Sequence, residues 1–198
     1  MSMYGGVLKL LRPSHLEVWR LAKPYLIKAR AYRHSIDALR FALKLLRIEG
    51  GDPDVVIPTA ILHDIGFSKT RIKWTQTTSG SLIPKHMEEG AKIAEEILNE
   101  ASYPKDKARE VVDIIRVHDL KPLPLQTLNA MVFKDADKLA GYYTMNGLRA
   151  YAKLRNKAIS DVLSELEEAM DSLITETGRQ IAKNQVRKLK RRLGRGTT

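Results

Sequence analysis

The chain has 198 residues, of which 43% are hydrophobic and 29% are charged. This length is typical of one domain, or of one domain with an appendage, and the composition excludes wholesale disorder. The sequence contains no cysteine, which excludes disulfide bonds, thiolate-ligated zinc or iron–sulfur sites and a cysteine nucleophile.

The positive charge is concentrated at the C-terminal end. The net charge is +11, and removing the eight basic residues of segment 179–198 from that total leaves +3 for residues 1–178. The segment has no acidic residue, and its basic residues are Arg179, Lys183, Arg187, Lys188, Lys190, Arg191, Arg192 and Arg195. We therefore expect that any binding of nucleic acid is weak and belongs to this tail.

Apolar residues spaced three and four apart predict helices in most of the chain. We place helices at 14–29, 33–48, 53–65, 85–100, 104–118, 126–141 and 157–193, with a break in the first near Pro24. Residues 67–84 form the one long irregular segment, which predicts a functional loop. No apolar stretch is long enough to cross a membrane and no signal peptide is visible, so we expect a cytoplasmic protein without membrane contact.

The predicted fold class is all-α, with a helical bundle over residues 1–156 and an extension over 157–198. The helix expected at 157–193 has apolar residues at spacings of three and four, and a second apolar stripe after Gly178. Such an amphipathic helix is long enough to lie along the domain or along a partner, so an oligomer is possible.

Ligand-type side chains share the apolar faces of several predicted helices. His34, His86, His118 and Asp137 each lie three, four or seven residues from apolar neighbours, and His63 and Asp64 end the helix expected at 53–65. Burying these groups without partners costs several kcal/mol each. Imidazole and carboxylate suit first-row divalent ions, so the set predicts a metal site. His15, at a helix start, is interpreted as a surface residue.

The order His34, His63-Asp64, Asp137 resembles the H…HD…D signature of the HD-domain metal-dependent phosphohydrolases. The segments ILHDIG and KDADKL match the sequence that usually surrounds these ligands in the family, and the resemblance spans residues 30–141. His86 and His118 resemble the additional ligands of two-metal members, such as HD-GYP phosphodiesterases and small nucleotide hydrolases.

The resemblance implies a ligand for each of these positions. One ion would be held by His34, His63, Asp64 and Asp137, and Asp64 would bridge to a second ion held by His86 and His118. The ions would be one or two of Mn, Fe, Mg, Co, Ni or Zn. Asp135 is the rival of Asp137 for the last position, and Asp119, which follows His118, is not assigned as a ligand.

The sequence departs from the family pattern in two places. Phe67 stands where a lysine often follows HDIG, and no GYP motif follows the HD pair, which argues against cyclic-di-GMP as the substrate. The missing phosphate contact could come from a basic residue of the loop or of the helix start that follows it. The candidates are Lys69, Arg71, Lys73 and Lys85.

The implied activity is hydrolysis of a phosphomonoester or phosphodiester, most readily a nucleotide, by a metal-bound hydroxide. Divalent ions lower the pKa of bound water and polarise phosphoryl oxygens. Asp64 and His63 would be the catalytic residues, with Asp64 orienting the water or taking its proton. Two alternatives remain open: a di-iron HD-type oxygenase, and a non-catalytic module with a structural metal and a tail that binds nucleic acid.

Overall fold

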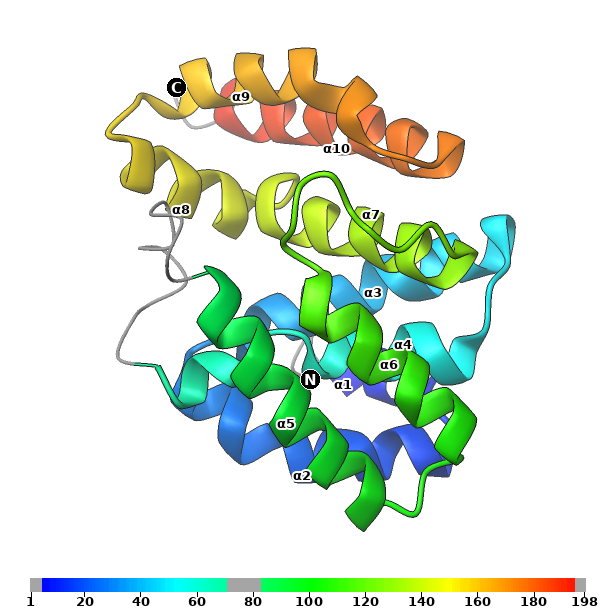
Figure 1. Ribbon diagram of the computed structural model, residues 1–198. Helices are drawn as coiled ribbons and strands as arrows, with labels where there is room; N and C mark the ends of the chain where they lie inside the picture. The colour runs from blue at the N-terminus through cyan, green and yellow to red at the C-terminus, as the bar shows by residue number, and fades with distance from the viewer. Residues whose placement is uncertain (1–4, 71–82, 195–198) are drawn as a thin grey trace.

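The computed structural model describes residues 5–70 and 83–194, and the helices it contains are shown in Figure 1. In chain order they are α1 (Gly5–Leu8), α2 (Pro13–Ala29), α3 (Tyr32–Glu49), α4 (Pro53–Leu62), the 3₁₀ helix η1 (Ile65–Ser68), α5 (Ile83–Glu100), α6 (Lys105–Val117), α7 (Leu128–Tyr142), α8 (Met145–Arg155), α9 (Ile159–Glu168), the 3₁₀ helix η3 (Ala169–Ser172) and α10 (Glu176–Gly194). The described ranges hold no strand, so the predicted all-α class is confirmed. Among these helices, none combines the length and the apolarity that crossing a membrane requires.

Helix α4 is the centre of the bundle. It contacts α2, α3, α6 and α7, and every residue from Val55 to Leu62 is buried. A helix that is apolar on all sides must be surrounded by other elements. It begins where the Asp52 side chain accepts a hydrogen bond from the Asp54 backbone N–H, with Pro53 in its first turn. Its C-terminal end delivers the His63-Asp64 pair into the middle of the bundle.

Helix α2 corrects two expectations. It runs through Pro24 without the predicted break. His15, expected on the surface, is only 1% exposed because α2 packs on α4. Its Nε2 atom lies 2.8 Å from Oδ1 of Asp54. Arg12 donates to the same carboxylate. The spacing of apolar residues within one helix cannot reveal the contact of His15 with Asp54, because Asp54 lies 39 residues further along the chain.

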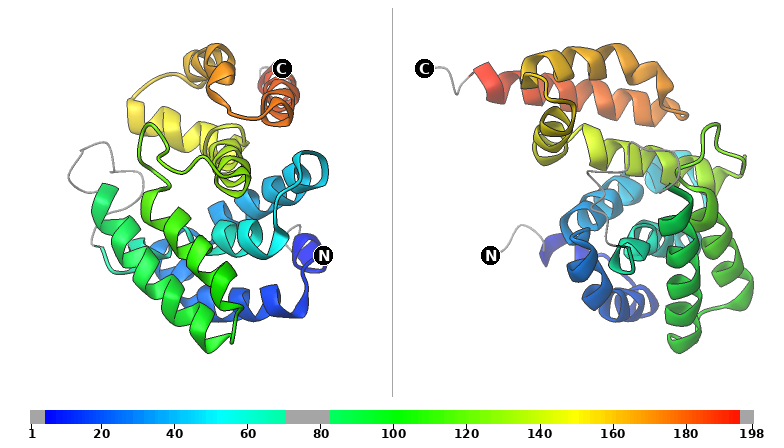
Figure 2. Two further views of the ribbon diagram at one scale, coloured as in Figure 1. Left: turned by 45° about the vertical axis from the view of Figure 1, so that its right-hand side comes forward. Right: turned by 60° about the vertical axis from the view of Figure 1, so that its left-hand side comes forward.

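The C-terminal part differs most from the prediction. Helix α8 is absent from the sequence-based assignment, and the single helix expected at 157–193 is two helices, α9 and α10, separated by η3 and a turn. Figures 1 and 2 show α9 and α10 side by side and antiparallel, at one end of the molecule above α7 and α8. We call α8, α9, η3 and α10 together the C-terminal layer.

Helix α10 is packed onto the bundle and does not project from it. Its buried residues Ala182, Val186 and Leu189 face α3, α7 and α9. The basic side chains from Lys183 to Arg192 are exposed, and Lys190 forms an ion pair with Glu167 of α9. Arg195 lies outside the described residues. The second apolar stripe in the sequence therefore marks a second helix that folds back on the first.

Candidate metal centre and its cavity

Six side chains from five helical segments converge at the middle of the bundle, and we call them the ligand cluster. They come from α3, from the turn after α4, from α5, from the C-terminal end of α6 and from α7. The members are His34, His63, Asp64, His86, His118 and Asp137. These are the six residues that the sequence predicts as metal ligands.

The first half of the ligand cluster lies around the Nε2 atom of His34. This atom is 3.1 Å from Nε2 of His63, 3.0 Å from Oδ1 of Asp137 and 3.6 Å from Oδ2 of Asp64. His34, His63 and Asp64 can each direct one ligand atom to a common point. Two imidazole nitrogens this close, facing two carboxylates, form a donor set that suits a divalent cation.

The second half of the ligand cluster shares Asp64 with the first. Asp64, His86 and His118 form another group whose ligand atoms lie within 4.8 Å of one another. Both ring nitrogens of His86 and Nε2 of His118 are buried, and within the described ranges they have no hydrogen-bond partner. Buried polar atoms without partners are costly, and a cation beside Asp64 would satisfy one ring nitrogen of each histidine. The residues therefore could hold one or two divalent ions, and Asp64 is common to both groups.

Neighbouring groups orient the histidine rings. Nδ1 of His63 lies 3.2 Å from the Ala60 carbonyl oxygen, and Nδ1 of His118 lies 2.8 Å from that of Ile115. Because a carbonyl can only accept, each Nδ1 carries the proton and each Nε2 is directed towards the cluster. The ring of Phe67 stacks on His86, with centroids 4.2 Å apart and planes 8° from parallel. The residue that replaces the family's lysine thus positions a histidine.

Backbone packing fixes the distance between the two halves. A Cβ atom on Gly66 would lie 1.9 Å from the carbonyl oxygen of His86, so only glycine permits this approach of η1 to α5. The HD turn and the first turn of α5 are therefore in direct backbone contact.

The charges of the ligand cluster stabilise one another. Burial alone would lower the pKa of His63, but the charge of Asp64 and its hydrogen bond outweigh burial and raise this pKa to about 9. Burial would raise the pKa of the Asp64 carboxyl, but His63 and His34 hold it well below its usual range. Imidazolium groups thus supply the positive charge beside the carboxylates, which divalent cations would supply in a metal-loaded site.

The structure separates Asp137 from its rival Asp135. The Asp135 carboxylate accepts hydrogen bonds from the backbone N–H groups of Ile174 and Thr175 and from the Thr175 hydroxyl, at 2.9, 2.7 and 2.8 Å. It holds the C-terminal layer on α7 and is directed away from His34. Asp137, half a helical turn further along α7, is directed towards the ligand cluster.

The ligand cluster opens into a cavity of about 310 Å³. His34, Asp64, His118 and Asp137 lie at its floor, and four basic side chains line it: Lys121, Lys134, Lys138 and Arg155. Burial lowers the pKa of Lys138, and the nearby Lys134 and Lys121 lower it further, whereas Asp135 acts in the opposite direction. Lysines crowded in this way favour an anion between them.

These cations are not the ones that the sequence suggests. Lys69 and Lys85 are exposed and do not line the cavity, and Arg71 and Lys73 lie outside the described residues. Lys134, which sequence reasoning missed, is 6% exposed, and its Nζ lies 3.5 Å from Oδ1 of Asp119 and 3.9 Å from Oδ2 of Asp137. Its position three residues before Asp137, on the same helical face, is the signal that could have identified it.

Asp119 is a second missed residue. Its Oδ2 lies 3.4 Å from Nε2 of His86 and 3.9 Å from Nε2 of His118, and it lines the cavity. Burial would raise the pKa of its carboxyl, but His118, His86 and Lys134 hold that pKa well below its usual range. The His118-Asp119 dipeptide is the sequence signal that could have identified Asp119. Helical periodicity could not predict the direction of its side chain, because Asp119 lies beyond the end of α6.

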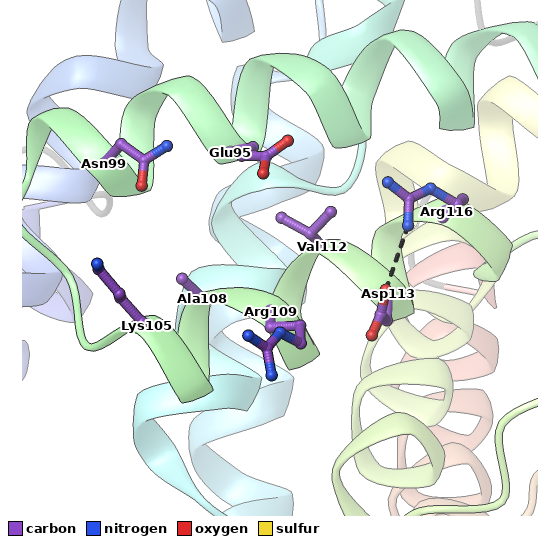
Figure 3. Close-up of a pocket in the computed structure, with 8 residues that line it drawn as sticks. All are labelled: Glu95, Asn99, Lys105, Ala108, Arg109, Val112, Asp113 and Arg116. Carbon is purple, nitrogen blue, oxygen red and sulfur yellow. Dashed lines mark hydrogen bonds and ion pairs between the residues drawn. The ribbon is translucent and has the colours of Figure 1, made fainter.

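Another hollow, of about 280 Å³, lies between α5 and α6 on the outside of the bundle (Figure 3). Glu95 and Asn99 line it from α5, and Arg109, Asp113 and Arg116 are among the residues on α6. No member of the ligand cluster reaches it, and its charges of both signs partly pair, as Arg116 does with Asp113 at 3.2 Å.

The sequence model of one family, described as the HD domain, matches residues 31–142. Comparison with curated proteins and with solved structures finds no match in either set. The matched residues include all six members of the ligand cluster and end at the last residue of α7. The chain therefore belongs to the HD-domain family, which is part of the superfamily of metal-dependent phosphohydrolases.

Proposed function

We propose that the protein hydrolyses a small organic phosphoester, most readily a nucleotide, with one or two divalent ions held by the ligand cluster. One observation carries the proposal: two groups of metal-ligand type share Asp64, and His34, Asp64 and His118 of these groups line a cavity that also has a cationic lining. A phosphate placed there would have metal-binding groups on one side and lysine ammonium groups on the other.

The bound ions would supply a water of lowered pKa and would polarise the phosphoryl oxygens. The residues of the chain provide the remainder. Asp64 lies between the two groups and can accept the proton of the attacking water. Lys134 and Lys138 can bind the phosphoryl oxygens on which negative charge develops.

In the reaction, the water oxygen forms a bond to phosphorus and the ester P–O bond breaks. The leaving oxygen takes a proton, and the net change is the addition of one water to the ester. A cation held beside Asp64 would keep its carboxylate ionised as an acceptor, as the charge on His63 does in the structure.

The cationic lining fits a phosphoester, because its phosphoryl oxygens carry negative charge that grows during hydrolysis. The deciding experiment loads the purified protein with each of Mn, Fe, Mg, Co, Ni and Zn and measures bound metal. Each form is then assayed, with and without dioxygen, on a panel of phosphomonoesters and phosphodiesters. Phosphate release that does not depend on dioxygen is expected. Dioxygen-dependent turnover, or no turnover with any metal, would overturn the proposal.

A further inference from the structure

A second cavity, of about 420 Å³, adjoins the one above the ligand cluster. The two cavities share five lining residues, which form a common wall: Lys121, Lys134, Lys138, Tyr142 and Tyr151. A molecule that placed a phosphate among the lysines would therefore have the second cavity directly beside it.

The second cavity is lined mainly by apolar and aromatic groups. Leu120, Leu123, Leu166 and Ile174 contribute to it, in addition to the shared tyrosines. Three of its residues are large apolar or aromatic side chains that stay partly exposed: Leu120 at 37%, Tyr142 at 37% and Ile174 at 38%. Large apolar side chains that gather around one hollow favour an apolar ligand, which would remove their surface from water.

Hydrogen bonds to α7 and its C-terminal end hold the far wall of this cavity in place. The hydroxyl of Tyr143 donates to the carbonyl oxygen of Leu166 at 2.8 Å. Nζ of Lys138 donates to the carbonyl oxygen of Ser172 at 2.6 Å. Asp135 fixes the backbone of Ile174. A preformed wall reduces the entropy lost when a ligand binds.

We propose that this second cavity, here called the ring subsite, binds an aromatic ring in the leaving group of the substrate. The phosphate would lie among the shared lysines, and the ring would pack against Tyr142, Tyr151 and Leu166. The inference rests on the proposed function for the position of the phosphate. It identifies the substrate class as phosphoesters whose leaving group carries a flat ring, either a nucleobase or a simple aryl group.

The ring subsite lies partly inside and partly outside the matched family region: Leu120, Leu123 and Tyr142 are within residues 31–142, and one wall lies beyond them. Leu166, Ala169, Ser172 and Ile174 belong to the C-terminal layer, beyond residue 142. The C-terminal layer thus completes a subsite whose other wall belongs to the part shared with the family.

The test fills the ring subsite from an exposed position. Ala169 lines the subsite and is exposed, so Ala169→Trp should occlude it without disturbing the core. Ala158→Trp is the matched control, because Ala158 is also exposed and lines neither cavity. Ile174→Asp is a second variant that makes the wall polar. Circular dichroism confirms that each variant folds.

Binding is measured by calorimetry on the metal-free chain with 1-naphthylphosphonate, adenosine 5′-monophosphate and methylphosphonate. The wild-type chain should bind at least one of the ring-bearing probes about tenfold or more tightly than methylphosphonate. Ala169→Trp and Ile174→Asp should remove that advantage, and Ala158→Trp should retain it. The ring-bearing probe that binds more tightly identifies the ring as aryl or nucleobase.

Hydrolysis of 1-naphthyl phosphate, adenosine 5′-monophosphate and glycerol 2-phosphate by the metal-loaded chain is measured in parallel. Loss of ring-selective binding in the two variants, without hydrolysis of any ester by the wild type, would support the ring subsite and contradict the proposed function. Hydrolysis with equal KM for all three esters, unaffected by Ala169→Trp, would retain the function and overturn the ring subsite. Equal binding of all three probes would overturn it as well.

Discussion

The ligand cluster and the C-terminal layer face each other across one cavity, and they are built in different ways. The ligand cluster is assembled from side chains at fixed helical spacings on buried faces, and its members all lie within residues 31–142. The C-terminal layer is held by the apolar packing of α10 and by hydrogen bonds from α7, such as those of Asp135 and Lys138. The contrast means that the metal-ligand groups and the layer that covers their cavity can be altered independently.

The largest effect is expected at the residue that joins the two halves of the ligand cluster. Asp64→Ala should empty both metal positions and reduce turnover to background, while circular dichroism still shows a helical protein, because no apolar stripe changes. Bound metal, activity and the helical signal are measured together. Asp161→Ala, on the exposed face of α9, should leave all three unchanged. Full activity in Asp64→Ala would refute the assignment of the metal centre.

A smaller loss is expected in the second half of the ligand cluster. His118→Ala should remove one of two bound ions and leave the ion at His34, His63 and Asp137, because these three side chains do not depend on α6 for their mutual distances. Metal analysis at saturating metal gives the stoichiometry. If the metal content and the rate are both unchanged, the second ion does not exist.

Substitution of Lys134 tests which basic side chains contribute to binding of the substrate phosphate. Lys134→Gln should reduce kcat/KM by about 10- to 100-fold, because Lys134 supports Asp119 and the His118 backbone beneath the phosphate position. Lys85→Gln and Lys69→Gln remove exposed lysines outside the cavity and should stay within about twofold of the wild type. Equal losses in all three variants would return the phosphate contact to the loop, as the sequence suggested.

The stability of the C-terminal layer should be separable from metal binding. Leu189 is 3% exposed in α10, so Leu189→Ala should reduce the free energy of unfolding by about 2–5 kcal/mol. Metal content at 25 °C should not change, since α10 carries no member of the ligand cluster. Urea unfolding measures the first quantity and metal analysis the second. Lys188→Ala, exposed on the same helix, serves as the control.

The smallest effect concerns His15, a buried histidine that is far from the ligand cluster. Burial lowers its pKa below the ordinary 6.5, although the bond to Asp54 acts in the opposite direction. Because the unfolded chain binds this proton more readily, the contribution of His15 to stability is full above about pH 6.5 and is lost as the pH falls.

His15→Gln should therefore reduce the loss of stability between pH 7.5 and pH 5.5 by about 1 kcal/mol or less. The difference between wild type and variant cancels the titration of the ligand cluster, which both share. Metal content should be unchanged. A variant that lost metal would show that His15 has a role in the site.

Sequence reasoning found the ligand cluster because helical periodicity fixes where a side chain points. His34, His86, His118 and Asp137 could each be placed on an apolar face before any coordinates were known. The same reasoning failed for Asp119, which follows the end of α6 and whose direction depends on the next turn. It also overlooked Lys134, since a lysine on an apolar stripe can extend its ammonium group to the surface.

The C-terminal layer could not be predicted because tertiary contacts override local pattern there. The sequence predicts no helix between residues 142 and 156, yet α8 forms there and packs so closely that a Cβ atom on Gly147 would lie 2.1 Å from the carbonyl oxygen of Gly141. The expected continuous helix at 157–193 is interrupted where Asp135 takes up the backbone N–H groups of Ile174 and Thr175. A partner 40 residues away is invisible to a local reading.

Gly66 has a consequence for how this site can change. The contact between the Gly66 backbone and the first turn of α5 sets the separation of the two halves of the ligand cluster. That separation is therefore a rigid dimension of the main chain, which no exchange of side chains can adjust. A descendant of this protein could adapt to an ion pair of different spacing only by sliding α5 along the HD turn, and such a shift would move His86 away from the Phe67 ring that stacks on it from η1.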